Sequence, residues 1–367
     1  MTTAVASPPH AGGGEGAAPG PPTVVSAPAP PSTRFSWIHN PALDIALALA
    51  WIPFALAAWA LLDNRVALNA LLAGVFLLSF SHQPLTLAFV YGDPAQFRLK
   101  RAIFTWAPFC FIVAALIGRN ISLALVAVVA GLWNAEHTLM QRYGVTRIYG
   151  RKAGDTHGML EKLMLISWLV LALVWVAADS RTGGFLQRLD LGATNADGVE
   201  ILRTLRPWAQ WLLVPTIATV LALTVAWLRV EWQRRETANR AKYVYVGSTA
   251  ALFVVMLINP ILGIMGYVAA HAIEYFAIVN QTLGKRYMAQ PGGGALGRAV
   301  RLPLGRPLFY ITYIGIIAAI VFSLKWHGDP TMYAVVYLTL GGMHVFYDGF
   351  IWKLRRPEVA GSVGATA

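Results

Sequence analysis

Long apolar runs alternate with short polar segments along almost the whole chain after residue 40. A helix needs about 20 mostly apolar residues to cross the hydrocarbon core of a bilayer. Ten segments meet this requirement, so the pattern predicts an all-α fold, a polytopic integral membrane helix bundle. The predicted spans are residues 41–62, 66–91, 102–118, 120–141, 159–178, 207–229, 243–258, 261–283, 307–324 and 330–352.

Two prolines predict breaks within these runs. The stretch 243–283 is too long for one span, and Pro260 within it favours a turn at Asn259, because proline lacks a backbone N–H and disfavours a helical residue before it. Pro84 lies two residues after His82. It cannot donate to the carbonyl of Phe80, which predicts a bend beside His82 that leaves this carbonyl free.

The two ends of the chain differ in composition from the spans. Residues 1–33 are rich in proline, alanine and glycine and contain one charge, Glu15, so we expect a disordered tail there. The transmembrane domain is then expected at residues 34–356. Residues 357–367 are expected to form a short flexible tail.

Basic residues divide the loops into two classes. Three to five Lys or Arg follow each even-numbered span, whereas the alternate loops are poor in charge or balanced. Because cytoplasmic loops carry the excess of positive charge, this alternation predicts ten spans with both termini cytoplasmic. The loop at 179–206 would then be external, and the expected location is a bacterial cytoplasmic (inner) membrane.

Composition supports a membrane protein and narrows its partners. The chain is 57% hydrophobic and 13% charged, whereas soluble domains carry about 25% charged residues. A net charge of +12 would suggest nucleic acid in a soluble protein. Here the basic residues lie between spans, so anionic lipid headgroups are the expected partner and nucleic acid is not. A single cysteine, Cys110, excludes an internal disulfide.

Four of the eight histidines lie within predicted spans, where ionisable groups are costly and mark function. They occupy spans two, four, eight and ten, which all run in one direction in the predicted topology. Each histidine falls at the middle or in the second half of its span, so we expect all four at one depth near the cytoplasmic side. They are His82, His137, His271 and His344.

Carboxylates lie one helical turn from two of these histidines. Glu274 follows His271 by three residues, and Asp348 follows His344 by four. Imidazoles and carboxylates without thiolates suit a transition metal such as iron, in a site of one or two ions. The predicted metal ligands are His82, His137, His271, Glu274, His344 and Asp348, where Glu274 and Asp348 either bind the metal or orient the histidines. Glu136 is the candidate proton donor or acceptor, and Gln141 and Tyr347 are candidate hydrogen-bond donors in catalysis.

Several functions are compatible with this set of residues. The first is a metal-dependent membrane oxidoreductase that acts on a lipid-soluble small molecule. The second is an electron-transfer protein in which two histidines bind a non-covalent haem. The third is a proton-coupled transporter with a His/Glu/Asp relay. The last is a scaffold whose polar groups only hold helices together.

A multi-span protein with internal histidines is similar in style to the membrane fatty acid desaturases and hydroxylases. The HxxxH and HxxHH boxes of those enzymes are absent, since no two of the four histidines lie within five residues of each other. The proline-histidine-glycine opening of membrane carotenoid-cleaving enzymes is absent as well. The pattern therefore assigns the chain to no family.

Overall fold

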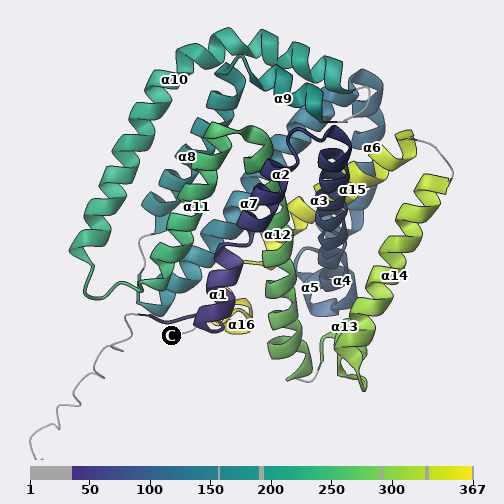
Figure 1. Cartoon of the computed structure of the whole chain (residues 1–367). Coiled ribbons are helices and arrows are strands. Elements are labelled where there is room, and N and C mark those ends of the chain that lie inside the picture. The colour runs from purple at the N-terminus through teal and green to yellow at the C-terminus, as the bar shows by residue number, and fades with distance from the viewer. Residues whose placement is uncertain (1–34, 156–157, 190–193, 290–291, 327–329, 366–367) are drawn as a thin grey trace, which may run out of the picture. The chain divides into compact units, whose positions relative to one another are not determined.

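The computed structural model describes residues 35–155, 158–189, 194–289, 292–326 and 330–365. These residues form helices joined by short connections, and no β-strand occurs among them (Figure 1). The predicted tail at residues 1–33 lies outside the described residues. The elements are α1 (Pro41–Ala48), α2 (Trp51–Ala60), α3 (Arg65–His82), α4 (Leu85–Gly92), α5 (Pro94–Leu99), α6 (Arg101–Ile121), α7 (Leu123–Lys152), α8 (Gly158–Ala178), α9 (Thr182–Arg188), α10 (Thr194–Gln233), α11 (Ala241–Ile258), α12 (Pro260–Thr282), the π-helix η1 (Leu283–Met288), α13 (Gly294–Arg301), α14 (Gly305–Trp326), α15 (Pro330–Ile351) and α16 (Pro357–Ser362).

Every predicted span coincides with a helix or a pair of helices. By length and composition, eight described helices could cross a membrane, and α1 with α2 forms a further candidate bent by 42°. A shorter apolar helix, Val335–Ile351, lies within α15. These helices indicate an all-helical, membrane-embedded protein, in agreement with the predicted fold class. The eight are Arg65–Gly92, Arg101–Ile121, Leu123–Lys152, Gly158–Ala178, Ala196–Gln233, Ala241–Ile258, Pro260–Met288 and Gly305–Leu324.

Both predicted proline breaks are confirmed. Asn259 separates α11 from α12, and its side chain accepts a hydrogen bond from the backbone N–H of Ile261 at 3.0 Å. Likewise α3 ends at His82 and α4 begins after Pro84. The prediction of a free Phe80 carbonyl was wrong, because this oxygen accepts the N–H of Gln83 at 3.3 Å. The chain tightens into an i to i+3 turn before the proline.

Three segments are more helical than the apolar pattern predicts. Helix α7 continues to Lys152, so Arg142 lies on a helix instead of in a loop. Helix α10 begins at Thr194, within the predicted external loop. The predicted flexible C-terminal tail contains α16, in which Val359 and Ala360 are buried. Hydropathy indicates where the apolar part of a helix ends. The helix itself continues as long as backbone hydrogen bonds and tertiary contacts stabilise it.

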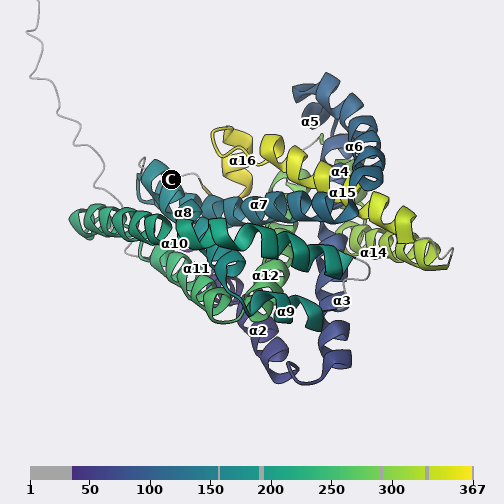
Figure 2. The ribbon, with the colours of Figure 1, turned by 90° about the horizontal axis from the view of Figure 1, so that it is seen from above.

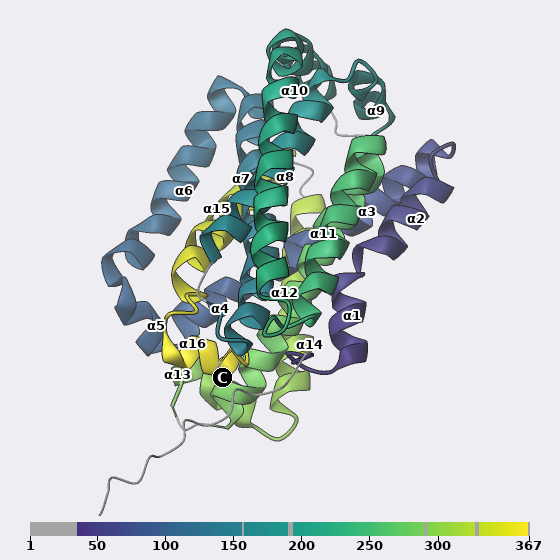
Figure 3. The same cartoon turned by 90° about the vertical axis from the view of Figure 1, so that its left-hand side faces the viewer.

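Helix α12 is the most enclosed long helix of the described fold. It packs against α1, α2, α3, α7 and α11, and 61% of its apolar window is buried, compared with 6% for α10. Figures 1 and 2 show α10 and α14 at opposite edges of this group of helices. Figure 3 shows α10 in front of α8 and α7, on the side away from α14. Helix α12 therefore offers positions that neither lipid nor water reaches.

Helices α11 and α12 approach closely beside their connecting turn. A Cβ atom placed on Gly263 would lie 2.4 Å from Cβ of Met256, closer than carbon atoms can approach without displacement. Gly74 in α3 has no atom within 4 Å of the corresponding position. The absence of a side chain at Gly263 thus sets the position of α12 against α11.

Gly263→Ala should therefore destabilise the fold by about 1–3 kcal/mol, because the added methyl group overpacks the α11–α12 contact. Gly74→Ala is the matched control and should keep or raise stability, since alanine favours helix and meets open space. Thermal unfolding of both variants in one detergent compares them. Equal melting temperatures for the two would contradict the close packing.

Candidate metal centre

The four intramembrane histidines come from four different helices and meet at one place. His82 ends α3, His137 lies in α7, His271 in α12 and His344 in α15. Each side chain is buried, with at most 8% exposure. The rings form a closed cycle in the order 82, 271, 137, 344, with neighbouring ring centroids 4.7–5.0 Å apart. Residues separated by up to 262 positions in sequence thus make one imidazole cluster.

Ring nitrogens point toward the middle of this cluster. Nε2 of His344 lies 3.2 Å from Nε2 of His82 and 3.1 Å from Nε2 of His137. Nitrogens of His82, His271 and His344 all lie within 4.8 Å of one another. Neutral imidazoles carry a lone pair on one nitrogen, and facing lone pairs repel. Three converging Nε2 atoms therefore need a proton or a cation among them.

A second layer of side chains orients His344. Oγ1 of Thr86 lies 2.7 Å from Nδ1 of His344 and donates to Oδ1 of Asp348 at 2.8 Å. Tyr275 donates to the same carboxylate oxygen at 3.1 Å. Because the Thr86 proton is used on Asp348, Nδ1 of His344 must be the donor to Thr86. The lone pair of His344 is then on Nε2, which faces His82 and His137.

His271 has no conventional partner in its buried position. Neither of its ring nitrogens makes a hydrogen bond in the described structure. A buried polar atom without a partner is costly, and native structures satisfy nearly all such atoms. In an apolar bundle this cost is especially high. The unpaired ring therefore points to a ligand within the cluster.

Asp348 is the carboxylate of this site. Its Oδ2 lies 3.7 Å from Nε2 of His137 and 3.8 Å from Nδ1 of His344. His137, His344 and Asp348 form a second group of close ligand atoms. The one-turn spacing from His344 that the sequence indicated thus brings Asp348 to the edge of the imidazole cluster.

Glu274 is used differently from the predicted ligand role. Its two carboxylate oxygens accept from Arg142 at 2.8 Å and from Gln141 at 3.1 Å, both on α7. Gln141 also donates to the backbone carbonyl of His271 at 3.1 Å. Glu274 belongs to none of the close groups of ligand atoms among the described residues. These contacts clamp α12 to α7, and so hold His271 beside His137.

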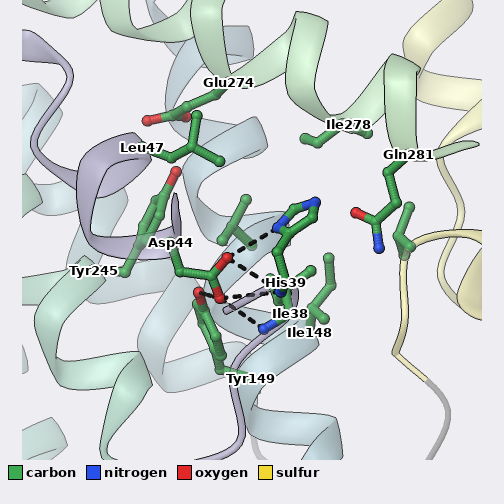
Figure 4. A pocket seen from close by; sticks show the side chains of 12 residues that line it. Ile38, His39, Asp44, Leu47, Ile148, Tyr149, Tyr245, Glu274, Ile278 and Gln281 are labelled. Atoms are coloured by element: carbon green, nitrogen blue, oxygen red, sulfur yellow. Dashed lines mark hydrogen bonds and ion pairs between the residues drawn. The ribbon is translucent and has the colours of Figure 1, made fainter. Parts of the chain in front are cut away.

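Arg142 is fully buried, so its positive charge needs the Glu274 carboxylate as a counter-charge. Its guanidinium also donates to Thr249 at 2.9 Å and lies 5.3 Å from the centre of the Tyr245 ring. Figure 4 shows Glu274 and Tyr245 beside a small cavity of about 20 Å³. In the same view Asp44 accepts from His39 Nδ1 at 2.9 Å and from Tyr149 at 2.8 Å. A second group of polar contacts, around Asp44, thus lines the same small cavity as the clamp.

The other two predicted catalytic residues lie in different surroundings. Glu136 is exposed and lines a cavity that also reaches His137 and Asp348. Tyr347 is buried on the far side of α15, where its hydroxyl lies 2.7 Å from that of Tyr91 and its ring packs on Phe104. The structure therefore places Glu136 near the site and Tyr347 away from it.

Sequence reasoning missed Thr86 and Tyr275. Tyr275 follows His271 by four residues, so the periodicity that identified Asp348 would also have identified it. Thr86 follows His82 by four residues as well, but the chain breaks at Pro84 between them. Its position therefore depends on a turn geometry that the sequence does not specify.

A second cluster of acids does not need a metal. Asp155, Glu161 and Glu231 bring carboxylate oxygens within 4.8 Å of one another. Nζ of Lys242 lies 2.5 Å from Glu231 and 3.2 Å from Glu161, and Arg147 and Arg234 pair with Asp155. Three cations balance three acids, so this is an ion network that joins α7, α8, α10 and α11.

Comparisons of this chain with protein-family models, with curated proteins and with solved structures gave no match. The functional argument therefore depends on the site itself.

Glu274→Ala should cost about 3–5 kcal/mol of unfolding free energy, because it leaves the Arg142 charge buried without its partner. Unfolding in mixed detergent micelles measures the loss. Glu200→Ala is the control, since it removes a carboxylate from the exposed Glu200–Arg203 pair and should change little. A Glu274→Ala variant as stable as the control would show that the clamp contributes nothing.

Proposed function

We propose that this chain is a metal-dependent membrane oxidoreductase acting on a lipid-soluble substrate. The proposed ligands are His82, His137, His271 and His344, with Asp348 as a ligand or a charge-balancing neighbour. The observation that carries the proposal is the convergence of four buried imidazoles, one of which has no hydrogen bond.

The spacing of the nitrogens suits a shared ion. Ligand nitrogens about 2.1 Å from one ion, at angles between a right angle and the tetrahedral angle, lie about 3.0–3.4 Å apart. The Nε2 separations of 3.1 and 3.2 Å fall within this range. Imidazole and carboxylate donors with open positions suit iron best among the common transition metals, and bound iron would supply one-electron and O₂ chemistry.

The residues around the histidines would prepare them for this role. Thr86 and Asp348 hold Nδ1 of His344 protonated, which leaves Nε2 free to bind, a common arrangement for ligating histidines. The Asp348 carboxylate would offset part of the ion's charge in an apolar environment. Because Glu274 pairs with Arg142, we propose it as a positioning residue for His271.

The apolar side chains that line the cavity beside the site support a lipid-soluble substrate. The cavity that contains Glu136 is bounded by α7 and α15 and includes the exposed ring of Trp133. Glu136 would hold or accept a proton beside the bound substrate, next to His137 in sequence and in space. Tyr275, which also lines the cavity, would keep Asp348 oriented.

The geometry favours a non-haem ion over the alternative of a haem. Nε2 atoms 3.1 and 3.2 Å apart are in contact, which leaves no gap for a macrocycle between two axial histidines. The proton-coupled transporter remains the alternative if the purified protein carries no metal.

Purified protein should contain about one transition-metal ion per chain, or two for a dinuclear site, by elemental analysis. His271→Ala and His344→Ala should each lower this content at least about tenfold, since even residues that only orient ligands contribute 10–100-fold in affinity. His39→Ala is the control, because His39 contacts Asp44 and not the cluster. Wild-type protein without stoichiometric metal would overturn the proposal.

We further propose that the chain crosses a bacterial inner membrane ten times, with both termini cytoplasmic and anionic headgroups against its basic ends. The ten predicted spans coincide with helices, and the basic residues gather at alternate helix ends. Alkaline phosphatase fused after Ala367 should therefore be inactive, whereas fusion within α9 should give active enzyme. The reverse pattern of activity would refute this orientation.

A further inference from the structure

The cavity beside the metal centre is large and has ends of different chemistry. Its volume is about 1330 Å³, and its walls come mainly from α7 and α15, with the start of α8 and the segment after α15. At one end it reaches His137 and Asp348. Ligand pockets of small molecules occupy about 300–1,000 Å³, so this cavity can hold a large substrate.

The opposite end of the cavity is basic. Arg147 and Arg151 follow His137 by 10 and 14 residues on α7, which places them about 15 and 21 Å further along the helix. Lys353 and Arg355 follow the end of α15, and Lys162 comes from α8. All five line the cavity.

Three of these cations have no counter-charge in the described structure. Arg147 pairs with Asp155, and Arg151 donates to the carbonyl of Leu354. The side chains of Lys162, Lys353 and Arg355, in contrast, make no hydrogen bond or ion pair with any described residue. The other two acids of the lining, Glu136 and Asp348, lie at the histidine end.

The wall between the two ends is apolar and aromatic. Met140 of α7 and Phe350 of α15 follow His137 and Asp348 toward the basic residues, and Trp352 comes next at the basic side. Such a wall excludes a hydrated polar chain and accepts hydrocarbon. The cavity thus continues from unpaired cations, past apolar side chains, to imidazoles and a carboxylate.

We propose that the substrate is an amphiphile with an anionic head, a carboxylate or a phosphate. The head binds Lys162, Lys353 and Arg355, and the hydrocarbon chain runs between α7 and α15. The reacting carbon then lies beside His137 and Asp348, on the order of 10 Å from the head, because Lys353 and Arg355 follow Asp348 by only five and seven residues. This inference rests on the proposed function, because it names the substrate class of the same site.

Binding of brominated lipids tests the proposal without turnover. Bromine quenches tryptophan fluorescence on contact, and Trp133 and Trp352 line the cavity. The probes are dibromostearate, its uncharged methyl ester and dibromo-phosphatidylglycerol, added to metal-loaded protein in a neutral detergent. The cavity signal is the part of the quenching that disappears in the Trp133→Phe/Trp352→Phe variant.

At least one anionic probe should reach half-maximal cavity quenching at a concentration about tenfold or more below that of the methyl ester. The reason is that its negative head is attracted to the cations of the cavity. Preference for dibromostearate would identify a carboxylate head, and preference for phosphatidylglycerol a phosphate head. The Lys162→Gln/Lys353→Gln/Arg355→Gln variant should lose the preference and keep its metal. The matched control replaces Lys100, Arg101 and Arg298, three exposed cations outside the cavity, by glutamine. This control should keep both the preference for the anionic probe and the metal.

The anionic substrate would be overturned if neither anionic probe quenched at a lower concentration than the methyl ester, or if the preference survived the cavity triple substitution. Either result in protein that retains its metal leaves the proposed metal centre intact. Protein that binds anionic lipid in the cavity but contains no metal would contradict the proposed function instead.

Discussion

The structure depends on one constraint: nitrogen lone pairs cannot remain unpaired in the apolar interior of a helical bundle. Four helices bring imidazoles together with neighbouring ring centroids no more than 5.0 Å apart, and His271 has no hydrogen bond in this position. Three Nε2 atoms converge around His344. A cation shared among these nitrogens, as we propose, would accept one lone pair from each ring.

The rest of the fold holds these rings in place. The chain break at Pro84 ends α3 at His82 and begins the helix that supplies Thr86, so one turn provides one histidine of the cluster and the group that orients another. The Arg142–Glu274 ion pair fixes α12 against α7. Its burial is tolerable because Thr249 and Gln141 satisfy further donors and acceptors of the pair. The close α11–α12 contact at Gly263 then sets the position of the same helix near its N-terminal end.

The sequence predicted much of the fold because hydropathy reports lipid contact directly. Ten apolar runs coincided with helices, and Pro84 and Pro260 marked real breaks. The sequence also identified the four histidines, because an ionisable side chain within an apolar span costs free energy, whichever residue it pairs with. It could not tell Asp348 from Glu274, because both lie one turn from a histidine. Only tertiary contacts show that Glu274 faces Arg142, a residue that hydropathy had assigned to a loop. Tyr347 was likewise chosen by sequence proximity, although it faces Tyr91.

X-ray absorption at the metal edge of purified, full-length protein tests the central claim most directly. A cluster of histidine ligands predicts a first shell of nitrogen or oxygen at about 2.0–2.2 Å, with the outer-shell scattering that imidazole rings produce. Substitution of His271, whose ring nitrogens make no hydrogen bond, should reduce that scattering. A metal bound without imidazole scattering, or an edge unchanged by the substitution, would contradict the assignment of these four residues as the site.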